Sequence, residues 1–461
     1  MFILKKKKIL LIHPPFTFGK KPKFTIPPLG IMYIAAILKK NNIDVRFIDA
    51  NAIGYTKEEL MNKIYKIHPD IIGFSVTTPQ IRDILLLIEE IPHVKICLGG
   101  PHVNSVQEEI FQFSNKIDYL FYNECEFSFL KFCQDYPLEE IDGMIYRTNG
   151  EIVKNKPSPH IKDLDSLPFP DLSMVNLSNY HSPYTTNYPM AAMICSRGCP
   201  FQCNFCDAFS THGRILRKRS PQNIVDEIEY NMKKFGIKYI AVKDSSFTTD
   251  KKWAHSVCEE IINRNLKISW NCNARVDCIN EELLKQMKIA GCHMIGYGVE
   301  SGSDEVLRLM NKGITVEQIK EAFRITHNIG IKTYAFFMIG NIGETKKTIR
   351  MTVDLAKELN PNLATFAVTT PYPNTALYRY AVENKLIDKY WYMKSTQAKY
   401  LGPATMSTGM KIELSLENIT KHVYKEFFFR PKYIVTYIKN IENLNMFKDA
   451  IKGFFEIFRY K

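Results

Sequence analysis

Short apolar runs alternate with amphipathic stretches along the first part of the chain. The amphipathic stretches have the apolar spacing of helices, and the runs between them are short enough to be buried strands. This alternation predicts a doubly wound α/β domain built on a mostly parallel sheet. Ligands of such sheets bind beyond the carboxyl ends of the strands, so the loops that follow the strands are the candidate binding loops. The predicted strands are 9–13, 45–49, 71–75, 94–98 and 119–122, the predicted helices are 29–40, 57–67 and 80–91, and the candidate loops are 49–54, 75–78, 99–104 and 123–126.

A second alternation of the same kind begins at Met190 and contains six strand–helix units. Six units are too few for a closed eight-stranded barrel, so the pattern predicts a partial, open (β/α)6 barrel. Its catalytic groups are also expected at the carboxyl ends of the strands. The predicted strands are 190–195, 239–242, 268–272, 294–299, 333–339 and 364–369, and the predicted helices are 221–235, 252–263, 281–290, 304–310, 316–329 and 345–359.

The remaining segments have weaker patterns. Prolines punctuate the polar stretch between the two alternations, which predicts a linker with a small hairpin at Asn149-Gly150. The tail is rich in Lys, Tyr, Phe and Ile, and 426–430 and 453–459 suggest amphipathic helices. The predicted parts are therefore a Rossmann-like domain at 1–136, a linker at 137–188, a partial barrel at 189–379 and a helical extension at 380–461.

Composition narrows the class of protein. Hydrophobic residues make up 45% of the 461 residues and charged residues 24%, which is ordinary for a globular protein and excludes a disordered chain, a collagen-like fibre or a small disulfide scaffold. No stretch approaches the roughly 20 apolar residues of a membrane span, and the N-terminus lacks a signal-peptide cleavage site. The sequence thus predicts a cytoplasmic protein whose eleven cysteines stay reduced.

The chain is basic, with 61 Lys and Arg against 48 Asp and Glu, a formal net charge of +13. Such an excess suits nucleic acid, an anionic membrane surface or anionic ligands, and it also arises in lysine-rich proteomes without any function. No nucleic-acid reader motif is evident, so no nucleic acid is expected as a partner. Residues 421–461 hold nine basic and four acidic residues. This tail is interpreted either as a helical appendage on the barrel or as a basic contact for a membrane surface or a lipid-like substrate.

The strongest chemical signal follows the first strand of the second alternation: Cys195-Ser-Arg-Gly-Cys199-Pro-Phe-Gln-Cys203-Asn-Phe-Cys206. The C-x3-C-x2-C spacing lets three thiolates converge on one compact cluster. Iron–sulfur clusters usually have four thiolate ligands, so three would leave one iron open for catalysis. The alternatives are a zinc site with Cys195 as fourth ligand, although zinc sites favour two separated C-x2-C pairs, and reduced core cysteines.

This loop resembles the cluster loop of radical S-adenosylmethionine (SAM) enzymes, and the resemblance extends from Met190 to about Tyr378. The resemblance implies that Cys199, Cys203 and Cys206 hold a [4Fe–4S] cluster whose open iron is chelated by SAM. It also implies reductive cleavage of SAM to a 5′-deoxyadenosyl radical, with the electron supplied by a flavodoxin- or ferredoxin-type donor. Phe205 matches the aromatic position whose backbone touches the adenine.

Further matches to this family follow at the ends of the later strands. Val242-Lys-Asp-Ser-Ser-Phe247 resembles an F-x-D-D-x-F strand end in which Ser245 replaces the second aspartate. The segments 270–277, 298–302, 339–344 and 371–378 resemble the ends of strands three to six. The SAM contacts implied by this resemblance, besides Phe205, are Asp244, Arg275, Glu300, Ser301 and Gly340.

The N-terminal domain is similar to the cobalamin-binding domain that precedes many radical SAM barrels. Its motif is D-x-H-x-x-G, then S-x-L or S-x-T, then GG. Asn51 occupies the position of the cobalt-ligating histidine, so the lower face of cobalt would be open, water-bound or held by another group. The sequence therefore predicts cobalamin with its dimethylbenzimidazole displaced and with no histidine on cobalt. The implied cobalamin contacts are Asp49, Asn51, Gly54, Ser75, Thr77, Gly99, Gly100 and His102.

Together these features predict a cobalamin-dependent radical SAM enzyme that acts on a small molecule, by preference methylating an unactivated carbon. Ring-forming or oxidative enzymes share the layout and remain an alternative. Two others are a radical SAM enzyme whose first domain binds no cobalamin and a non-catalytic cobalamin or iron–sulfur sensor. The substrate cannot be read from the motifs.

Overall fold

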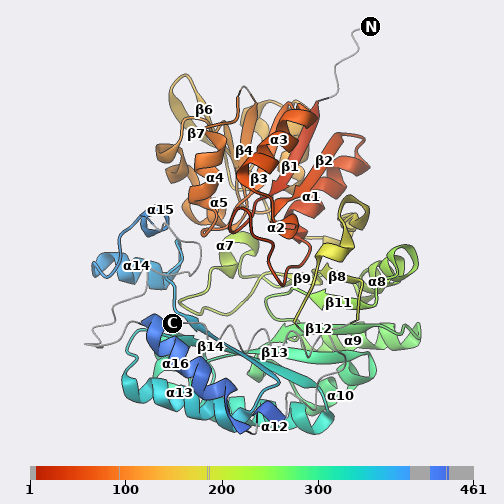
Figure 1. Cartoon of the computed structure of the whole chain (residues 1–461). Coiled ribbons are helices and arrows are strands. Elements are labelled where there is room, and N and C mark those ends of the chain that lie inside the picture. The colour runs from red at the N-terminus through yellow and green to blue at the C-terminus, as the bar shows by residue number, and fades with distance from the viewer. Residues whose placement is uncertain are drawn as a thin grey trace.

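The structure is a computed structural model that describes residues 7–394 except 93, 184 and 186, and residues 416–435 except 432. Two sheets are stacked end to end in Figure 1, the N-terminal one above and the barrel sheet below. Both sheets are built from the predicted alternations. Their strand order and their mutual contacts decide where ligands can bind.

The N-terminal sheet has seven strands in the order β2-β1-β3-β4-β5-β6-β7. The first five pair in parallel and the last two are antiparallel, which confirms the doubly wound, mostly parallel sheet. Helices cover both faces, as expected when strands are apolar on both sides. Its elements are β1 (Lys8–His13), α1 (Leu29–Lys40), β2 (Asp44–Asp49), α2 (Ala50–Ile53), α3 (Lys57–Ile67), β3 (Ile71–Ser75), α4 (Ile81–Ile88), β4 (Lys95–Gly99), α5 (Pro101–Val106), β5 (Tyr119–Phe121), α6 (Glu126–Cys133), β6 (Met144–Thr148) and β7 (Glu151–Lys154).

The hairpin predicted at Asn149-Gly150 is present, and it lies in the segment predicted as a linker. Its strands β6 and β7 extend the first sheet, because β6 pairs with β5. After the hairpin the chain has only short 3₁₀ turns before the second sheet, at Leu164–Ser166, Leu172–Met174 and Leu177–Asn179. The connecting part is therefore shorter than the proline pattern suggested.

The second sheet has six parallel strands in the order β15-β14-β13-β12-β11-β8. Its edge strands β8 and β15 are not paired with each other, so the predicted open (β/α)6 barrel is confirmed. Its strands are β8 (Met190–Met193), β11 (Tyr239–Val242), β12 (Ser269–Ala274), β13 (Cys292–Glu300), β14 (Lys332–Ile339) and β15 (Leu363–Val368). Its helices are α8 (Pro221–Phe235), α9 (Lys251–Asn263), α10 (Glu281–Ile289), α11 (Asp304–Leu309), α12 (Val316–Ile329) and α13 (Lys346–Leu359).

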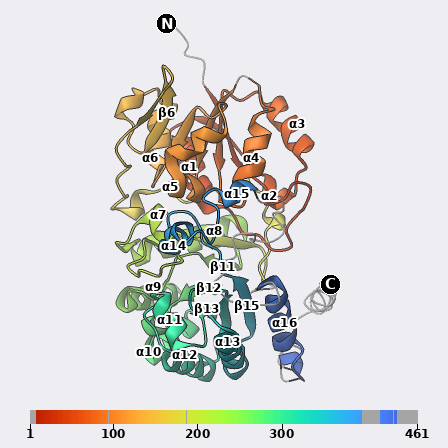
Figure 2. The same ribbon diagram turned by 90° about the vertical axis from the view of Figure 1, so that its left-hand side faces the viewer.

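The described part of the tail packs on both sheets. α14 (Ala376–Glu383) and α15 (Trp391–Lys394) lie at the level between the sheets in Figure 2, and Trp391 and Tyr392 join the core of the first domain. α16 (Leu416–Phe428) covers β15, where the buried Phe427 contacts Phe366. Here the tail is a helical appendage that completes the outer layer of the barrel, and the predicted segment 453–459 lies outside the described residues. In the part of the chain that is described, no helix has the length and apolar character to cross a bilayer.

Candidate active site

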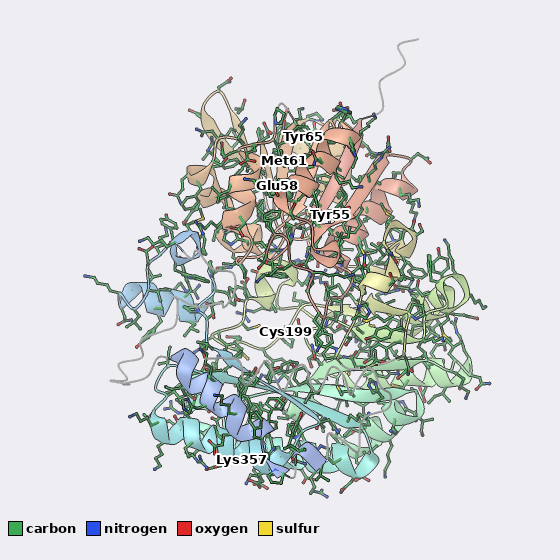
Figure 3. All side chains as sticks on the ribbon, in the orientation of Figure 1. Tyr55, Glu58, Met61, Tyr65, Cys199 and Lys357 are labelled. Atoms are coloured by element: carbon green, nitrogen blue, oxygen red, sulfur yellow. The ribbon has the colours of Figure 1, made fainter. Side chains whose placement is uncertain are left out.

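The cysteine loop lies between the two sheets, as the labelled Cys199 shows in Figure 3. A short antiparallel pair, β9 (Ser196–Arg197) and β10 (Arg217–Lys218), closes the loop, and α7 (Ala208–His212) lies within it. Gly198 has φ +91°, and a Cβ there would lie 2.1 Å from the Ile215 carbonyl oxygen, so only glycine allows this closure. The Cys199 N–H donates to the Gly213 carbonyl at 3.1 Å. Cys195 instead is 1% exposed within the barrel core, away from the loop.

Two cations border the loop thiols. The Arg275 Nη1 lies 4.0 Å from the Cys203 Sγ, and its guanidinium stacks 3.7 Å from the centre of the Phe201 ring. Burial raises the pKa of the Cys203 thiol, while Lys312 and Arg275 oppose that rise. No described trio of His, Cys, Asp or Glu side chains converges as the ligands of one metal ion would. A multi-iron cluster holds its thiolates farther apart than a single ion does, and the neighbouring cations suit its negative charge.

Asp244 supports the strand that enters the loop. Its carboxylate accepts hydrogen bonds from the Cys195 N–H at 2.7 Å and the Ser196 hydroxyl at 2.6 Å. Burial raises the pKa of Asp244 to about 6, although these donors oppose the rise. Both of its oxygens are engaged with the loop strand, whereas Ser245 is exposed. The geometry therefore gives Asp244 a positioning role beneath the cysteine loop.

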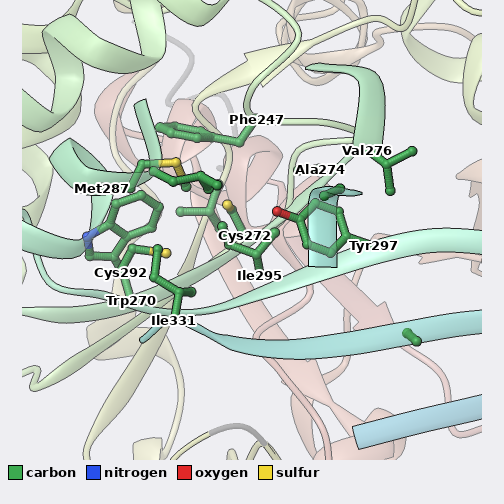
Figure 4. Packing of buried hydrophobic residues seen from close by; sticks show 14 of the residues in the cluster. Phe247, Trp270, Cys272, Ala274, Val276, Met287, Cys292, Ile295, Tyr297 and Ile331 are labelled. Atoms are coloured by element: carbon green, nitrogen blue, oxygen red, sulfur yellow. The ribbon is translucent and has the colours of Figure 1, made fainter. Parts of the chain in front are cut away.

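Alternate residues of strand β12 pack between the sheet and the barrel helices. Figure 4 shows Trp270, Cys272 and Ala274 in this hydrophobic core, so the other residues of the strand point to the concave face of the sheet. Arg275 follows the last residue of this strand. Its Nε and Nη2 donate to the Asp277 carboxylate, and its Nη2 also donates to the Lys312 carbonyl. Nη1 is the nitrogen that approaches the Cys203 sulfur.

A buried ion pair lies at the end of β13. The Lys312 Nζ donates to the Glu300 Oε1 at 2.7 Å, and both side chains are less than 10% exposed. Glu300 has φ +64°, a conformation that is strained for a residue with a side chain. A Cβ at Gly298 would lie 2.5 Å from the Glu300 Oε1, so a side chain there would fill the space that the pair occupies. Lys312 belongs to no motif, and the sequence analysis missed it.

The remaining predicted SAM contacts are Ser301, Phe205 and Gly340. Ser301 turns toward α13, where its hydroxyl lies 3.3 Å from the Thr352 hydroxyl. Phe205 and Ile342 both pack against the cluster of Leu377 and Ala381, which brings the cysteine loop near the end of β14. Gly340 directly follows β14 and has φ +94°. Its N–H donates to Glu344. Five predicted contacts thus gather at the carboxyl edge, and Ser301 is directed away from it.

The part of the concave face formed by β14 is largely apolar. Along β14, the residues Ala335, Phe337 and Ile339 are buried toward the helices, so Tyr334, Phe336 and Met338 face the concave side. These three side chains are partly exposed, and the Tyr334 and Phe336 rings lie 4.2 Å apart. This surface suits a small molecule with an apolar portion.

In the first domain, Asp49 is the most connected of the predicted cobalamin contacts. Its carboxylate accepts hydrogen bonds from the Ala52 N–H at 3.0 Å and the Tyr180 hydroxyl at 2.8 Å, and it also contacts the His13 Nδ1 at 2.9 Å. The Asn51 amide oxygen accepts from the Phe16 N–H, and its nitrogen donates to Thr25. Gly54 has φ +82°, and a Cβ there would lie 2.6 Å from the Lys21 nitrogen.

The other predicted cobalamin contacts follow β3 and β4, which pair so that Ser75 lies opposite Gly99. Gly100 has φ +98°, and a Cβ there would lie 2.8 Å from the Val76 nitrogen. The Thr77 hydroxyl donates to Gln80. His102 is 1% exposed, its Nδ1 lies 3.1 Å from the Thr78 hydroxyl, and burial lowers its pKa to about 3.

An ion-pair network joins the loop 123–126 of the first domain to the cysteine loop. Arg217 reaches both oxygens of Glu124 at 2.7 Å, and the His212 Nδ1 lies 2.9 Å from Oε1. Arg197 pairs with Glu126 at 2.6 Å. Burial alone would raise the pKa of Glu124, but hydrogen bonds from His212 and Arg217 hold it well below its usual value. The loop that follows β5 is therefore tied directly to the cysteine loop.

Two family models match the chain, one over the first domain and one over the barrel. The B12 binding domain matches residues 17–128, and the radical SAM superfamily matches residues 193–356. An uncharacterized methyltransferase from Pyrococcus horikoshii is 31% identical over 471 residues, which covers 99% of each chain. The chain is a radical SAM enzyme with a B12-binding domain.

Two further comparisons describe its relationships. An anaerobic magnesium-protoporphyrin IX monomethyl ester cyclase from Cereibacter sphaeroides is 31% identical over 390 residues, covering 81% of this chain and 63% of the cyclase. A solved structure of the cobalamin-dependent SAM radical enzyme OxsB, with aqua-cobalamin and SAM bound, superimposes with a TM-score of 0.74 at 18% identity. That match covers 98% of this chain and 71% of OxsB, and it confirms the fold.

This chain belongs with the cobalamin-dependent radical SAM methyltransferases. Its cofactors are a [4Fe–4S] cluster, SAM and cobalamin. The residues present fit these groups. Three thiols share one loop beside Arg275 and Lys312, which suits an anionic cluster. The glycine cradle at Gly100 and the polar ends of β2 and β3 leave backbone and small side chains where a large cofactor must approach closely.

Glu344 gives a pH-dependent prediction for the end of β14. It is 1% exposed, its Oε1 has no partner within the described residues, and burial raises its pKa from 4.5 to about 7 despite the Gly340 and Asn341 N–H donors. The native state therefore holds this proton more tightly than the unfolded chain, and the free energy of unfolding falls as pH rises from about 4.5 to 7. The shift corresponds to about 3 kcal/mol.

Glu344→Gln is expected to remove this part of the pH dependence. The melting temperature of anaerobically purified protein, measured from about pH 5 to 8, should fall less in the variant than in the wild type. Glu383→Gln, at an exposed position on α14, is the matched control and should follow the wild type. Parallel profiles for wild type and Glu344→Gln would contradict the assignment.

Proposed function

We propose that this enzyme transfers a methyl group from SAM to an unactivated carbon of a small molecule. The observation that carries the proposal is the network of Glu124, Glu126, Arg197 and Arg217, which holds the cobalamin-binding edge against the cysteine loop. Asn104 and Ser105 add hydrogen bonds to Thr211 and Asp207 at 2.9 and 2.8 Å. A methyl carrier and a radical source act on one carbon only if both reach the same space.

The bound cofactors supply a methyl group and a radical able to abstract hydrogen from carbon, and the chain supplies their binding and orientation. In this proposal Cys199, Cys203 and Cys206 hold the cluster. Asp244 fixes the backbone of the entering strand through the Cys195 N–H. The Arg275 guanidinium lies against the loop at Cys203, where its charge favours the thiolate form.

We assign the Glu300–Lys312 pair to the polar end of SAM. A carboxylate and an ammonium side by side match the amino and carboxylate groups of its methionyl part. Phe205, Gly340 and Ile342 form the adjoining apolar surface, which suits the adenine. Asp49, Asn51, Gly54, Ser75, Thr77, Gly99, Gly100 and His102 are retained as the cobalamin contacts.

The substrate in this proposal lies over the concave face of β14 and β15. Tyr334, Phe336 and Met338 offer it an apolar, aromatic wall. An electron must also enter the cluster, and we propose a flavodoxin- or ferredoxin-type donor, as expected for a cytosolic enzyme of this chemistry.

Ring formation or oxidation is the second candidate. The observation that favours it is the 31% identity with a magnesium-protoporphyrin cyclase over 81% of this chain. Such a reaction would use the same radical source and the same concave face without adding a carbon to the product.

Turnover with methyl-labelled SAM separates the two candidates. The reduced holoenzyme, incubated anaerobically with a small-molecule extract, should place labelled methyl in a product and release S-adenosylhomocysteine together with 5′-deoxyadenosine. Cys199→Ala is the control and should yield neither product. Release of 5′-deoxyadenosine with no labelled product and no S-adenosylhomocysteine would favour ring formation or oxidation.

The cluster ligands can be tested one by one. Wild-type protein reconstituted without oxygen should hold about four irons per chain, and Cys199→Ala, Cys203→Ala or Cys206→Ala should lose the cluster and SAM cleavage. Cys195→Ala should keep both, because Cys195 is buried in the barrel core. Iron content and 5′-deoxyadenosine release are the measurements. Loss of the cluster in Cys195→Ala would overturn this ligand set.

Glu300→Gln tests the SAM site. A charge-assisted hydrogen bond is worth roughly 1.5–3 kcal/mol, so the SAM dissociation constant should rise about tenfold or more while the iron content is unchanged. Glu305→Gln, an exposed carboxylate five positions along, is the matched control and should bind SAM as the wild type does. Equal affinities for Glu300→Gln and wild type would remove Glu300 from the site.

A further inference from the structure

A lysine without a counter-charge lies at the carboxyl edge of the barrel. Lys243 directly follows β11, and its N–H donates to the Met193 carbonyl at 2.8 Å, so the backbone there still pairs with the neighbouring strand β8. The side chain is only partly exposed, and burial lowers the pKa of its ammonium group. Within the described residues, no carboxylate pairs with it. Neither the cluster ligands nor the assigned SAM contacts use this charge.

We propose that Lys243 binds a negatively charged oxygen group of the substrate, a carboxylate or a phosphate, so that the enzyme acts on anionic small molecules. The proposal rests on the proposed function in one respect, because it takes the concave face of the barrel as the place where the substrate binds. It does not depend on the reaction, so it holds for methyl transfer and for ring formation alike.

The alternation of β11 directs Lys243 to the concave face. Ile240 and Val242 pack in the core between the sheet and the barrel helices. Tyr239 and Ala241 belong to a separate cluster on the other side of the sheet. Alternate residues of a strand share a face, so Lys243 lies on the side of Tyr239 and Ala241.

This end of the concave face adjoins the cobalamin-binding domain. The concave residues of β11 pack with Ala52 of α2 and with Tyr180 of the connecting segment. The helix α2 directly follows Asp49, one of the predicted cobalamin contacts. A substrate group held by Lys243 therefore lies at the border of the two domains, which the proposed function requires.

The pairing of the strands places a row of residues beside Lys243. β11 and β12 pair so that Ala241 lies opposite Asn271, and both chains reach the row two residues further on. The pairing of β12 with β13 and of β13 with β14 carries the row across the sheet. From β11 to β14, its members are Lys243, Asn273, Gly296 and Tyr334. The row thus passes from an ammonium group through an amide to an aromatic ring.

The polar and apolar parts of this face meet at Gly296. A Cβ there would lie 2.7 Å from the Asn273 Oδ1 and 2.9 Å from the Phe336 ring, so the amide and the ring border the same spot. Within the described residues, the Asn273 side chain makes no hydrogen bond. Its amide N–H groups can therefore donate to a ligand that rests its apolar part against Phe336.

An anion satisfies both polar groups at once. An ammonium group that is partly withdrawn from water and has no partner is disfavoured. A charge-assisted hydrogen bond to a carboxylate or phosphate oxygen stabilises the charged form of Lys243, and the Asn273 amide can donate to the same group. The row therefore suits a molecule with an anionic end at β11 and an apolar part at β14.

Stimulation of SAM cleavage tests the class of substrate. A small-molecule extract is separated at neutral pH on an anion exchanger, and each fraction is added to the reduced holoenzyme. The retained fraction should raise the release of 5′-deoxyadenosine, and the unretained fraction should not. Treatment with alkaline phosphatase should abolish the effect of a phosphate monoester and leave that of a carboxylate. Stimulation by the unretained fraction alone would overturn the proposal.

A substitution assigns the effect to Lys243. Lys243→Gln removes the charge, so the amount of retained fraction that gives half-maximal stimulation should rise about tenfold or more. The SAM dissociation constant and the iron content should stay as in the wild type. Lys238→Gln is the matched control, because Lys238 is exposed and directly precedes the same strand. An unchanged half-maximal amount would overturn the proposal, and so would a loss of SAM affinity, which would place Lys243 in the SAM site.

Acetylation by trace acetic anhydride tests the site without a substrate. Only an uncharged amine reacts, and peptide mass spectrometry of the holoenzyme gives the rate for each lysine. Inorganic phosphate should slow the acetylation of Lys243 several-fold relative to chloride at equal ionic strength, and it should leave Lys238 unaffected. Equal rates for Lys243 in the two salts would overturn the proposal, and this measurement decides alone if no fraction stimulates SAM cleavage.

Failure of the proposed function has a different signature. A retained fraction that raises 5′-deoxyadenosine release, without labelled methyl in any product, would contradict methyl transfer. The same result would support an anionic substrate held by Lys243, provided that Lys243→Gln weakens the response.

Discussion

The arrangement of the whole molecule depends on one buried carboxylate, that of Glu124. An ionised carboxylate taken out of water costs several kcal/mol unless it is paired and hydrogen-bonded. Here Arg217 binds both oxygens, and His212 and the Ile161 N–H complete the set. The donors come from the cysteine loop and the connecting segment, while Glu124 follows β5 of the first sheet. Satisfying this one charge therefore fixes the cobalamin-binding edge against the cysteine loop.

The same principle organises the rest of the site. Charged groups at the strand ends are buried in pairs or against backbone donors: Glu300 with Lys312, Arg275 with Asp277, and Asp244 with the Cys195 N–H. Each arrangement fixes a side chain beside the cysteine loop, and the one at Arg275 leaves Nη1 directed toward Cys203. Cofactors that carry the hard chemistry need such fixed surroundings, because the protein contributes orientation and charge. The strained backbone of Glu300 fits this pattern, since strain persists only where the surroundings overdetermine the conformation.

The sequence located the strand ends that carry the candidate site, while the partners of single residues depend on the fold. The strand ends were located correctly because the apolar period of a strand and its closing turn are local signals. The partners of single residues are not local signals. The SAM contacts at Asp244 and Ser301 stay predictions, but the sequence did not show the hydrogen bonds that these residues make within the protein. Asp244 accepts from Cys195 and Ser196, some fifty positions earlier in the chain. The Ser301 hydroxyl lies beside that of Thr352 on α13, because neighbouring residues leave a strand end in different directions.

By itself the sequence determined the two alternations, the open six-stranded barrel, the cysteine loop and the three cofactors, because these depend on local periodicity and on short motifs. It also placed asparagine at position 51, where the motif that it resembles has a histidine. Only the tertiary structure decided which distant residues meet: Lys312 and Glu300, Arg197 and Glu126, Arg217 and Glu124, and His13 and Asp49. Such pairings depend on strand order and on the packing of one sheet against another. No local pattern encodes them, since a side chain that completes a site needs only the right place in space.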